Sequence, residues 1–126
     1  MILAFVDDLL YLSKIQQTAE LIGVTVQPAD PTGELERIAA EAPSALILDL
    51  NHRSIPALEF LLSLKAHPRT RAIPIVGFVS HVQSDLIAAA RQAGCDLVLA
   101  RSAFTQRLPE LLRKLAGSDA TAPSEM

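Results

Sequence analysis

Three aspartates of this 126-residue chain stand where their side chains could do chemistry together. Asp7 and Asp8 directly follow the apolar run 2–6, and Asp49 directly follows the apolar run 45–48. Two unit charges about 4 Å apart repel by roughly 4 kcal/mol at an effective dielectric near 20, so three carboxylates in one crevice need neutralising. Mg²⁺ would do this, because it prefers carboxylate oxygens and can bridge to a phosphoryl group. Proton uptake by one aspartate is the alternative.

The loop after the first apolar run does not suit a bound nucleotide or flavin phosphate. It reads Asp7-Asp8-Leu9-Leu10 and offers neither a glycine nor a hydroxyl group. Phosphates are commonly bound through such groups at a helix N-terminus, and two carboxylates repel them. A flavodoxin-like cofactor protein is therefore disfavoured, and we do not expect the chain to be an enzyme.

The elements that position the aspartates follow from alternating apolar runs and amphipathic segments. These predict strands at 2–6, 24–27, 45–48, 73–79 and 96–100, and helices at 9–21, 32–41, 57–66, 83–93 and 103–115. Successive strand–helix units imply a parallel sheet with right-handed crossovers and helices on both faces. The predicted fold class is α/β, a doubly wound, five-stranded parallel sheet of order 2-1-3-4-5 in a flavodoxin-like three-layer sandwich. In that order the first and third strands are neighbours, so their aspartates should meet at one edge.

Composition and length fit one domain of this kind. Half of the residues are hydrophobic, but only one tyrosine and four phenylalanines are present, so the core must be mainly aliphatic. We expect a domain at 1–116 and a polar, disordered tail at 117–126. The net charge of -3 and the lack of a Lys/Arg-rich block argue against nucleic-acid binding.

The first apolar run has no basic start and stops at two aspartates, which argues against a signal peptide or a membrane span. We therefore expect a cytoplasmic protein without membrane contact. The single cysteine, Cys95, suits a small buried residue, and His52, His67 and His81 are too scattered for a metal cluster. His81 is expected to be a solvated loop residue.

Four stretches of the chain resemble the receiver domains of two-component response regulators, the CheY-like family. They are Ile2-Leu3-Ala4-Phe5-Val6-Asp7-Asp8, Leu46-Ile47-Leu48-Asp49-Leu50, Pro68-Arg69-Thr70-Arg71-Ala72-Ile73-Pro74-Ile75-Val76 and Ala93-Gly94-Cys95-Asp96. The resemblance implies that Asp49 is the phosphoacceptor. It also implies that Asp7, Asp8, Asp49 and the backbone carbonyl of Asn51 hold Mg²⁺. The chemistry would be in-line transfer from a phosphohistidine to a carboxylate.

Several positions depart from the receiver pattern. The hydroxyl-bearing position of the fourth strand falls on Val79, and Ser80 could supply the hydroxyl group if the register shifts by one. The family's lysine falls on Arg101, which keeps the charge but carries a bulky planar group. Arg101 is therefore either a cation for the phosphoryl group or the ion-pair partner of an aspartate. The aromatic switch position falls on Val98, and Arg53 stands where a proline is common.

Two questions about the roles of Asp7 and Asp8 also remain open. Asp7 and Asp8 could simply cap the helix predicted at 9–21, because carboxylates satisfy its free N–H groups and favour its dipole. The interval from Asp8 to Gly23 is one residue shorter than is usual in the family, which would place Asp7 at the metal position.

Two functions follow from the resemblance. The first is a stand-alone, atypical receiver in phosphorelay signalling that accepts phosphate on Asp49 with Mg²⁺ from a histidine kinase or phosphotransfer protein. It would act through a downstream protein partner, by analogy through the face formed by 83–93, 96–100 and 103–115, which could also form a homodimer. The alternative is a pseudo-receiver, a protein interaction or dimerisation module that does not depend on phosphorylation, which the Val79, Val98 and Arg101 changes favour.

Overall fold

The computed structural model describes residues 1–29, 35–80 and 83–117. Its strands are β1 (Ile2–Phe5), β2 (Val26–Pro28), β3 (Ala45–Asp49), β4 (Ile75–Val79) and β5 (Leu97–Ala100). Its helices are α1 (Leu9–Leu21), α2 (Leu35–Glu41), α3 (Ala57–Ala66), α4 (Ser84–Gln92), α5 (Arg101–Gln106) and α6 (Leu108–Leu115). The strands form one sheet of order β2-β1-β3-β4-β5 in which every paired neighbour is parallel. The predicted fold class and strand order are confirmed.

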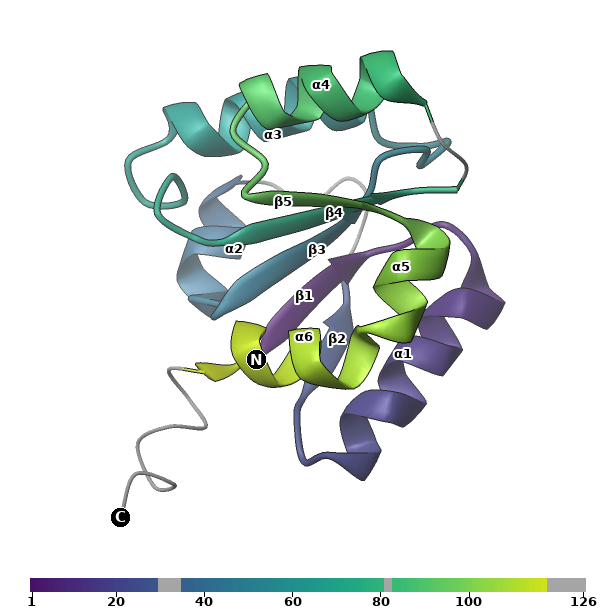
Figure 1. The fold of residues 1–126 in the computed structure, drawn as a ribbon. Helices are drawn as coiled ribbons and strands as arrows, with labels where there is room; N and C mark the ends of the chain where they lie inside the picture. Colours follow the sequence, from purple (N-terminus) through teal and green to yellow (C-terminus); the bar gives the residue numbers. More distant parts are fainter. Residues whose placement is uncertain (30–34, 81–82, 118–126) are drawn as a thin grey trace.

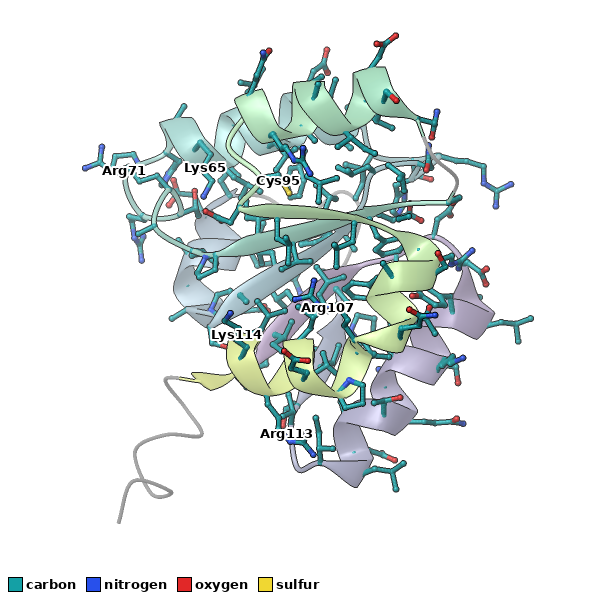
Figure 2. The ribbon with its side chains drawn as sticks, viewed as in Figure 1. Lys65, Arg71, Cys95, Arg107, Arg113 and Lys114 are labelled. Carbon is teal, nitrogen blue, oxygen red and sulfur yellow. The ribbon has the colours of Figure 1, made fainter. Side chains whose placement is uncertain are left out.

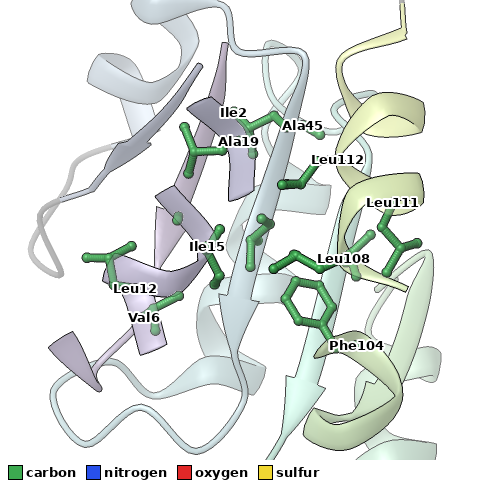
Figure 3. Close-up of a cluster of buried hydrophobic side chains, with 14 of the residues drawn as sticks. Ile2, Val6, Leu12, Ile15, Ala19, Ala45, Phe104, Leu108, Leu111 and Leu112 are labelled. Atoms are coloured by element: carbon green, nitrogen blue, oxygen red, sulfur yellow. The ribbon is translucent and has the colours of Figure 1, made fainter. Parts of the chain in front are cut away.

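The sheet lies between two layers of helices (Figure 1). Helices α1, α5 and α6 cover one face, where the core cluster drawn in Figure 3 includes Ile15 of α1 and Leu112 of α6. Helices α2, α3 and α4 cover the other face, over a second cluster. Alternate residues of β1 enter the two clusters: Ile2 points to the first and Leu3 to the second. A strand buried on both faces reads as a continuous apolar run, which is why this signal was clear in the sequence.

Helix α1 begins and ends where the sequence predicted. Asp8 is its N-cap, and Gly23, two residues beyond its last turn, has a φ of 76° that favours glycine. The buried face is Tyr11, Leu12, Ile15 and Ala19. Leu9, although apolar and within the predicted helix, does not belong to this face, since it is 76% exposed. With Asp8 as the cap, Leu9 is the first helical residue and its phase turns it to solvent.

The predicted final helix, 103–115, is two helices in the structure. Helix α5 starts at Arg101 and ends at Gln106, and α6 starts at Leu108 after Arg107. Pro109 lies in the first turn of α6. It has no N–H to continue the hydrogen-bond ladder of α5, but its fixed φ suits a helix start, so it separates the two.

Three predicted strands begin too early. Strand β2 starts at Val26 because the N–H of Val24 still donates to Ala19 of α1, at 2.9 Å. Strand β4 starts at Ile75 because Ile73 closes a turn onto Thr70, and β5 starts at Leu97. The helices predicted at 57–66 and 83–93 are α3 and, shortened by one residue at each end, α4.

Some predictions fall on residues outside the described part. These are the first turn of the helix predicted at 32–41, the loop position of His81, and the tail beyond residue 117. The domain boundary at 116 stays a prediction. None of the helices within the described ranges is long and apolar enough to cross a membrane.

Candidate functional site

Asp49 lies at the carboxyl end of β3, next to the end of β1. Phe5 of β1 pairs with Leu48 of β3, so the loop that starts at Val6 leaves the sheet beside Asp49. The Asp49 side chain is buried: the residue is only 5% exposed. Its Oδ1 accepts a hydrogen bond from the N–H of Asn51 at 2.9 Å, and its Oδ2 accepts a longer one from the N–H of Asp7 at 3.4 Å. Backbone amides thus orient this carboxylate towards the crevice between the two strand ends.

An open pocket of about 570 Å³ lies at this edge of the sheet. All six residues named from the sequence line it: Asp7, Asp8, Asp49, Asn51, Ser80 and Arg101. Leu9, Leu10 and Arg53 line it as well. The prediction that the three aspartates meet at one edge of the sheet is therefore confirmed.

Asp8 has two structural partners. Its Oδ1 accepts hydrogen bonds from the N–H groups of Leu10 and Tyr11, at 3.0 and 3.1 Å, and so caps α1. Its Oδ2 forms an ion pair with Nη2 of Arg101 at 2.8 Å. The hydrogen bond from Tyr11 and the Arg101 guanidinium lower the pKa of the Asp8 carboxyl. Both structural roles that the sequence left open, the helix cap and the ion pair, are present.

The Arg101 guanidinium packs on an aromatic ring. Its guanidinium carbon lies 3.9 Å from the ring centroid of Tyr11, which is a cation–π contact. The Tyr11 hydroxyl makes a 2.7 Å hydrogen bond with Thr105 Oγ1, and Thr105 in turn donates to the Arg101 carbonyl at 2.9 Å. Arg101 Nε is buried and has no hydrogen-bond partner among the described residues. Tyr11 and Thr105 were missed from the sequence because aromatic packing under a cation leaves no spacing signal.

Asp7 pairs with the second arginine of the pocket. Arg53 Nε lies 2.8 Å from Asp7 Oδ2, and the Arg53 N–H donates to the same oxygen at 3.3 Å. These hydrogen bonds lower the pKa of the Asp7 carboxyl. The sequence showed Arg53 only as a departure from the family pattern. Its position in the loop after the third strand, at the same edge as the aspartates, was the signal that could have identified it.

The loops after β3 and β4 are joined through Asn51. Its side-chain Oδ1 accepts from the N–H of Ser80 at 2.8 Å, and its Nδ2 donates to Gln83 at 2.7 Å. Ser80 therefore reaches the pocket, while Val79 is fully buried in the core under α2, α3 and α4. Of the two candidates for the hydroxyl-bearing position, only Ser80 lines the pocket.

The aromatic side chains grouped around Arg101 and Tyr11 lie on the opposite face of the sheet from Val98. Val98 is buried in the cluster under α2, α3 and α4. Tyr11, Phe78 and Phe104 contact one another in the cluster under α1, α5 and α6, with Phe78 and Phe104 stacked at 5.2 Å. The residues of an aromatic switch coupled to a strand-four hydroxyl are therefore absent at 79 and 98.

The donor set of the pocket fits Mg²⁺ in its chemistry but is not assembled as a metal cage. Within the described ranges, no group of three or more His, Cys, Asp or Glu side chains is arranged to hold a metal ion. Asp8 is committed to α1 and Arg101. The donors that remain are the Asp49 carboxylate, the Asn51 carbonyl and the Asp7 carboxylate, which pairs with the exposed Arg53. Mg²⁺ is commonly held by one or two carboxylates with waters and phosphate oxygens, so this smaller set is sufficient.

His67 and Cys95 do not line the pocket, whereas His52 stands between the pocket residues Asn51 and Arg53, and, beside the Arg53 hydrogen bonds, its charge helps to lower the pKa of Asp7. His67 contacts Glu36 at 3.1 Å, and His52 accepts a hydrogen bond from the N–H of Ser54. Cys95 is 5% exposed and lies between the sheet and the layer of α3 and α4 (Figure 2). Burial raises the pKa of its thiol to about 11.

The fold and pocket together define a doubly wound α/β domain with an acidic crevice at its switch point, and solved structures share this fold. A signal receiver domain from a DNA-binding response regulator of Colwellia psychrerythraea superposes with a TM-score of 0.80, at 17% identity over 92% of this chain and 97% of that one. A Chloroflexus aurantiacus protein assigned as a response regulator gives 0.79, at 22% identity over 92% and 96%. The Mn²⁺-bound response regulator Rcp1 gives 0.67, at 19% identity over 91% and 90%.

The chain thus has the fold of response-regulator receiver domains, and the resemblance seen in its sequence is confirmed. Its sequence is 36% identical, over 125 residues, to protein-glutamate methylesterase/protein-glutamine glutaminase 5 of Myxococcus xanthus. That match takes in 90% of this chain but 35% of the relative, so the chain spans about a third of the relative's length. No family model matches the chain.

Proposed function

We propose that this chain is a receiver-type signalling domain that accepts a phosphoryl group on Asp49 with the help of Mg²⁺. The phosphodonor would be a histidine kinase or phosphotransfer protein, and the output would pass to a protein partner. The observation that carries the proposal is the position of Asp49, oriented by backbone amides, in one pocket with Asp7, Asn51, Ser80 and Arg101.

The reaction is a transfer between two side chains. An Asp49 oxygen attacks the phosphorus of a phosphohistidine, the new O–P bond forms as the P–N bond breaks, and the imidazole nitrogen that leaves takes a proton. Such a transfer depends on positioning and on neutralising charge more than on acid or base catalysis. Asp7, Asp49 and the Asn51 carbonyl would hold Mg²⁺, which neutralises the transferring group when bound. The Ser80 hydroxyl and the Arg101 guanidinium line the same pocket and would donate to that group, Arg101 while it remains paired with Asp8.

The surface beside the pocket suits a protein donor. Leu9 and Leu10, at the start of α1, line the pocket and are 76% and 86% exposed. Apolar side chains with this exposure are available for contact with a partner that brings its histidine to Asp49. For the downstream partner, or for a second copy of the chain, we propose the face formed by α4, β5 and the α5–α6 segment.

Intact mass spectrometry tests the phosphoacceptor role. The protein is incubated with acetyl phosphate and Mg²⁺, and we expect one phosphoryl group to be added to the wild type and none to Asp49→Asn or to wild type with EDTA. Asp96→Asn is the matched control, because Asp96 also lies at a sheet edge but far from the pocket, where it bonds the N–H of Ile75. An unmodified wild type, or equal modification of Asp49→Asn, would contradict the proposal.

A second candidate function is a pseudo-receiver, and the ion pairs of the pocket favour it. Arg53 and Arg101 give Asp7 and Asp8 counter-ions from the chain itself, and Val79 supplies no hydroxyl group. On this view the fold is an interaction or dimerisation module that does not depend on phosphate. Replacing the wild-type gene by an Asp49→Asn copy should then leave the cellular function intact, and loss of function with an intact fold would count against this candidate.

A further inference from the structure

The two arginines of the pocket hold their aspartates in different ways. The Arg101 side chain is 28% exposed, lies on the Tyr11 ring and reaches Asp8, which also caps α1. The Arg53 side chain is 86% exposed, and its ion pair and side-chain hydrogen bond are with Asp7. An exposed ion pair is weak because water and salt screen it, whereas a pair packed on an aromatic ring is held by more than its charge.

Asp7 is also the pocket carboxylate that is easiest to release. The Asp7 side chain is 23% exposed, and its Oδ2 accepts two hydrogen bonds, one from Arg53 Nε and one from the Arg53 N–H. The backbone donor keeps the carboxylate at the mouth of the pocket when the guanidinium leaves. The Asp8 carboxylate cannot leave its place in the same way, because its movement would remove the cap of α1.

We infer that Arg53 is an exchangeable counter-ion of Asp7, which competes with a divalent cation for this carboxylate and so sets the affinity of the pocket for Mg²⁺. The inference rests on the metal site of the proposed function. Arg53 pairs with the Asp7 carboxylate and would be displaced from it when Asp7 and Asp49 hold a cation. Arg101 stays with Asp8 throughout, because Tyr11 and the α1 cap hold that pair in place.

Calorimetric titration of the full chain with MgCl₂, without a phosphodonor, tests the inference. The variant Arg53→Gln removes the competing charge, and Arg69→Gln is the matched control. Arg69 is also exposed and forms a comparable surface pair, with Glu36 at 3.6 Å, and both changes alter the net charge equally. We expect Arg53→Gln to bind Mg²⁺ about two- to five-fold more tightly than Arg69→Gln, which is the range a removed surface ion pair can give. The difference should shrink in high salt because exposed charges are screened.

A double variant locates the effect. In the double variant Arg53→Gln/Asp7→Asn, the gain in Mg²⁺ affinity that Arg53→Gln gives should disappear, because the carboxylate for which Arg53 competes is gone. Equal or weaker binding by Arg53→Gln than by Arg69→Gln would overturn the inference, and so would a gain that survives Asp7→Asn. Absence of Mg²⁺ binding in all variants would also overturn it. Tighter binding by Arg53→Gln together with no phosphorylation of any variant would refute the proposed function and leave the inference standing.

Discussion

Each carboxylate of the pocket meets a different partner. Asp7 pairs with Arg53, Asp8 caps α1 and pairs with Arg101, and Asp49 accepts hydrogen bonds from backbone amides. The repulsion that three clustered carboxylates would create is therefore relieved by two guanidinium groups and a helix N-terminus. The sequence offered the helix cap and the Arg101 ion pair as possibilities, but it did not show that Arg53, in the loop after β3, pairs with Asp7.

The thiol of Cys95 should be inert in the folded protein. Burial raises its pKa to about 11, so roughly one thiol in a thousand is ionised near pH 8, and only the thiolate is strongly nucleophilic. We expect alkylation by iodoacetamide at that pH to be at least about a hundred-fold slower in buffer than in denaturant. The denatured protein is its own reference because Cys95 is the only cysteine of the chain. Comparable rates in the two conditions would show that the thiol is exposed.

At the scale of elements, the apolar runs predicted the buried strands well. The spacing of apolar residues predicted less well which residues of a helix face the core. The runs of β1 and β3 are buried on both faces, so almost every residue in them is apolar. Leu9, by contrast, has the right residue type but lies before the buried stripe of α1, because the cap at Asp8 fixes the helix phase. The split between α5 and α6 depends on where Pro109 falls relative to a helix start, and the apolar pattern does not encode this.

Much of what α6 contributes to the stability of the domain should come from one side chain at the centre of the helix. Leu112 is fully buried between α6 and the sheet (Figure 3), so Leu112→Ala should lower the free energy of unfolding by about 2 to 5 kcal/mol. Leu21→Ala is the matched control, since Leu21 is 86% exposed and the same truncation should change stability by less than about 0.5 kcal/mol. Urea unfolding measures both. Similar losses for the two variants would mean that α6 is not packed as described.

At the scale of the molecule, the sheet order decides which residues can share a site. Strand neighbours β1 and β3 bring Asp7 and Asp49 together across 42 positions of sequence, and this could be predicted from the order of the elements. The contact of Tyr11 with Arg101 joins α1 to α5 across the same edge. It depends on how two helices pack on one face of the sheet, which the strand order alone does not determine. The meeting of the aspartates and the Arg101 ion pair could therefore be predicted from the sequence, whereas the Arg53 ion pair and the Tyr11 contact could not.

The stability of the whole domain should depend on acid through the aspartates of the pocket. Hydrogen bonds from Arg53 and from the Tyr11 amide lower the folded-state pKa of Asp7 and Asp8 below the ordinary value of 3.8. The unfolded chain then binds protons more readily than the folded one. The stabilisation is therefore complete above about pH 4 to 5 and is lost as pH falls through the folded-state pKa values.

Urea unfolding midpoints measured from neutral pH down to about pH 2.5 test this dependence. Asp8→Asn is the informative variant, because asparagine is also a good N-cap but cannot ionise or attract Arg101. Its midpoint should be lower than that of the wild type at neutral pH, and the two should converge as the pH falls below about 4, where Asp8 of the wild type takes up its proton. In the Arg101→Gln background, the difference in midpoint between proteins with and without Asp8→Asn should be smaller at neutral pH, because the guanidinium is gone and the cap remains. Parallel profiles for wild type and Asp8→Asn across the whole range would show that this carboxylate does not link folding to acid.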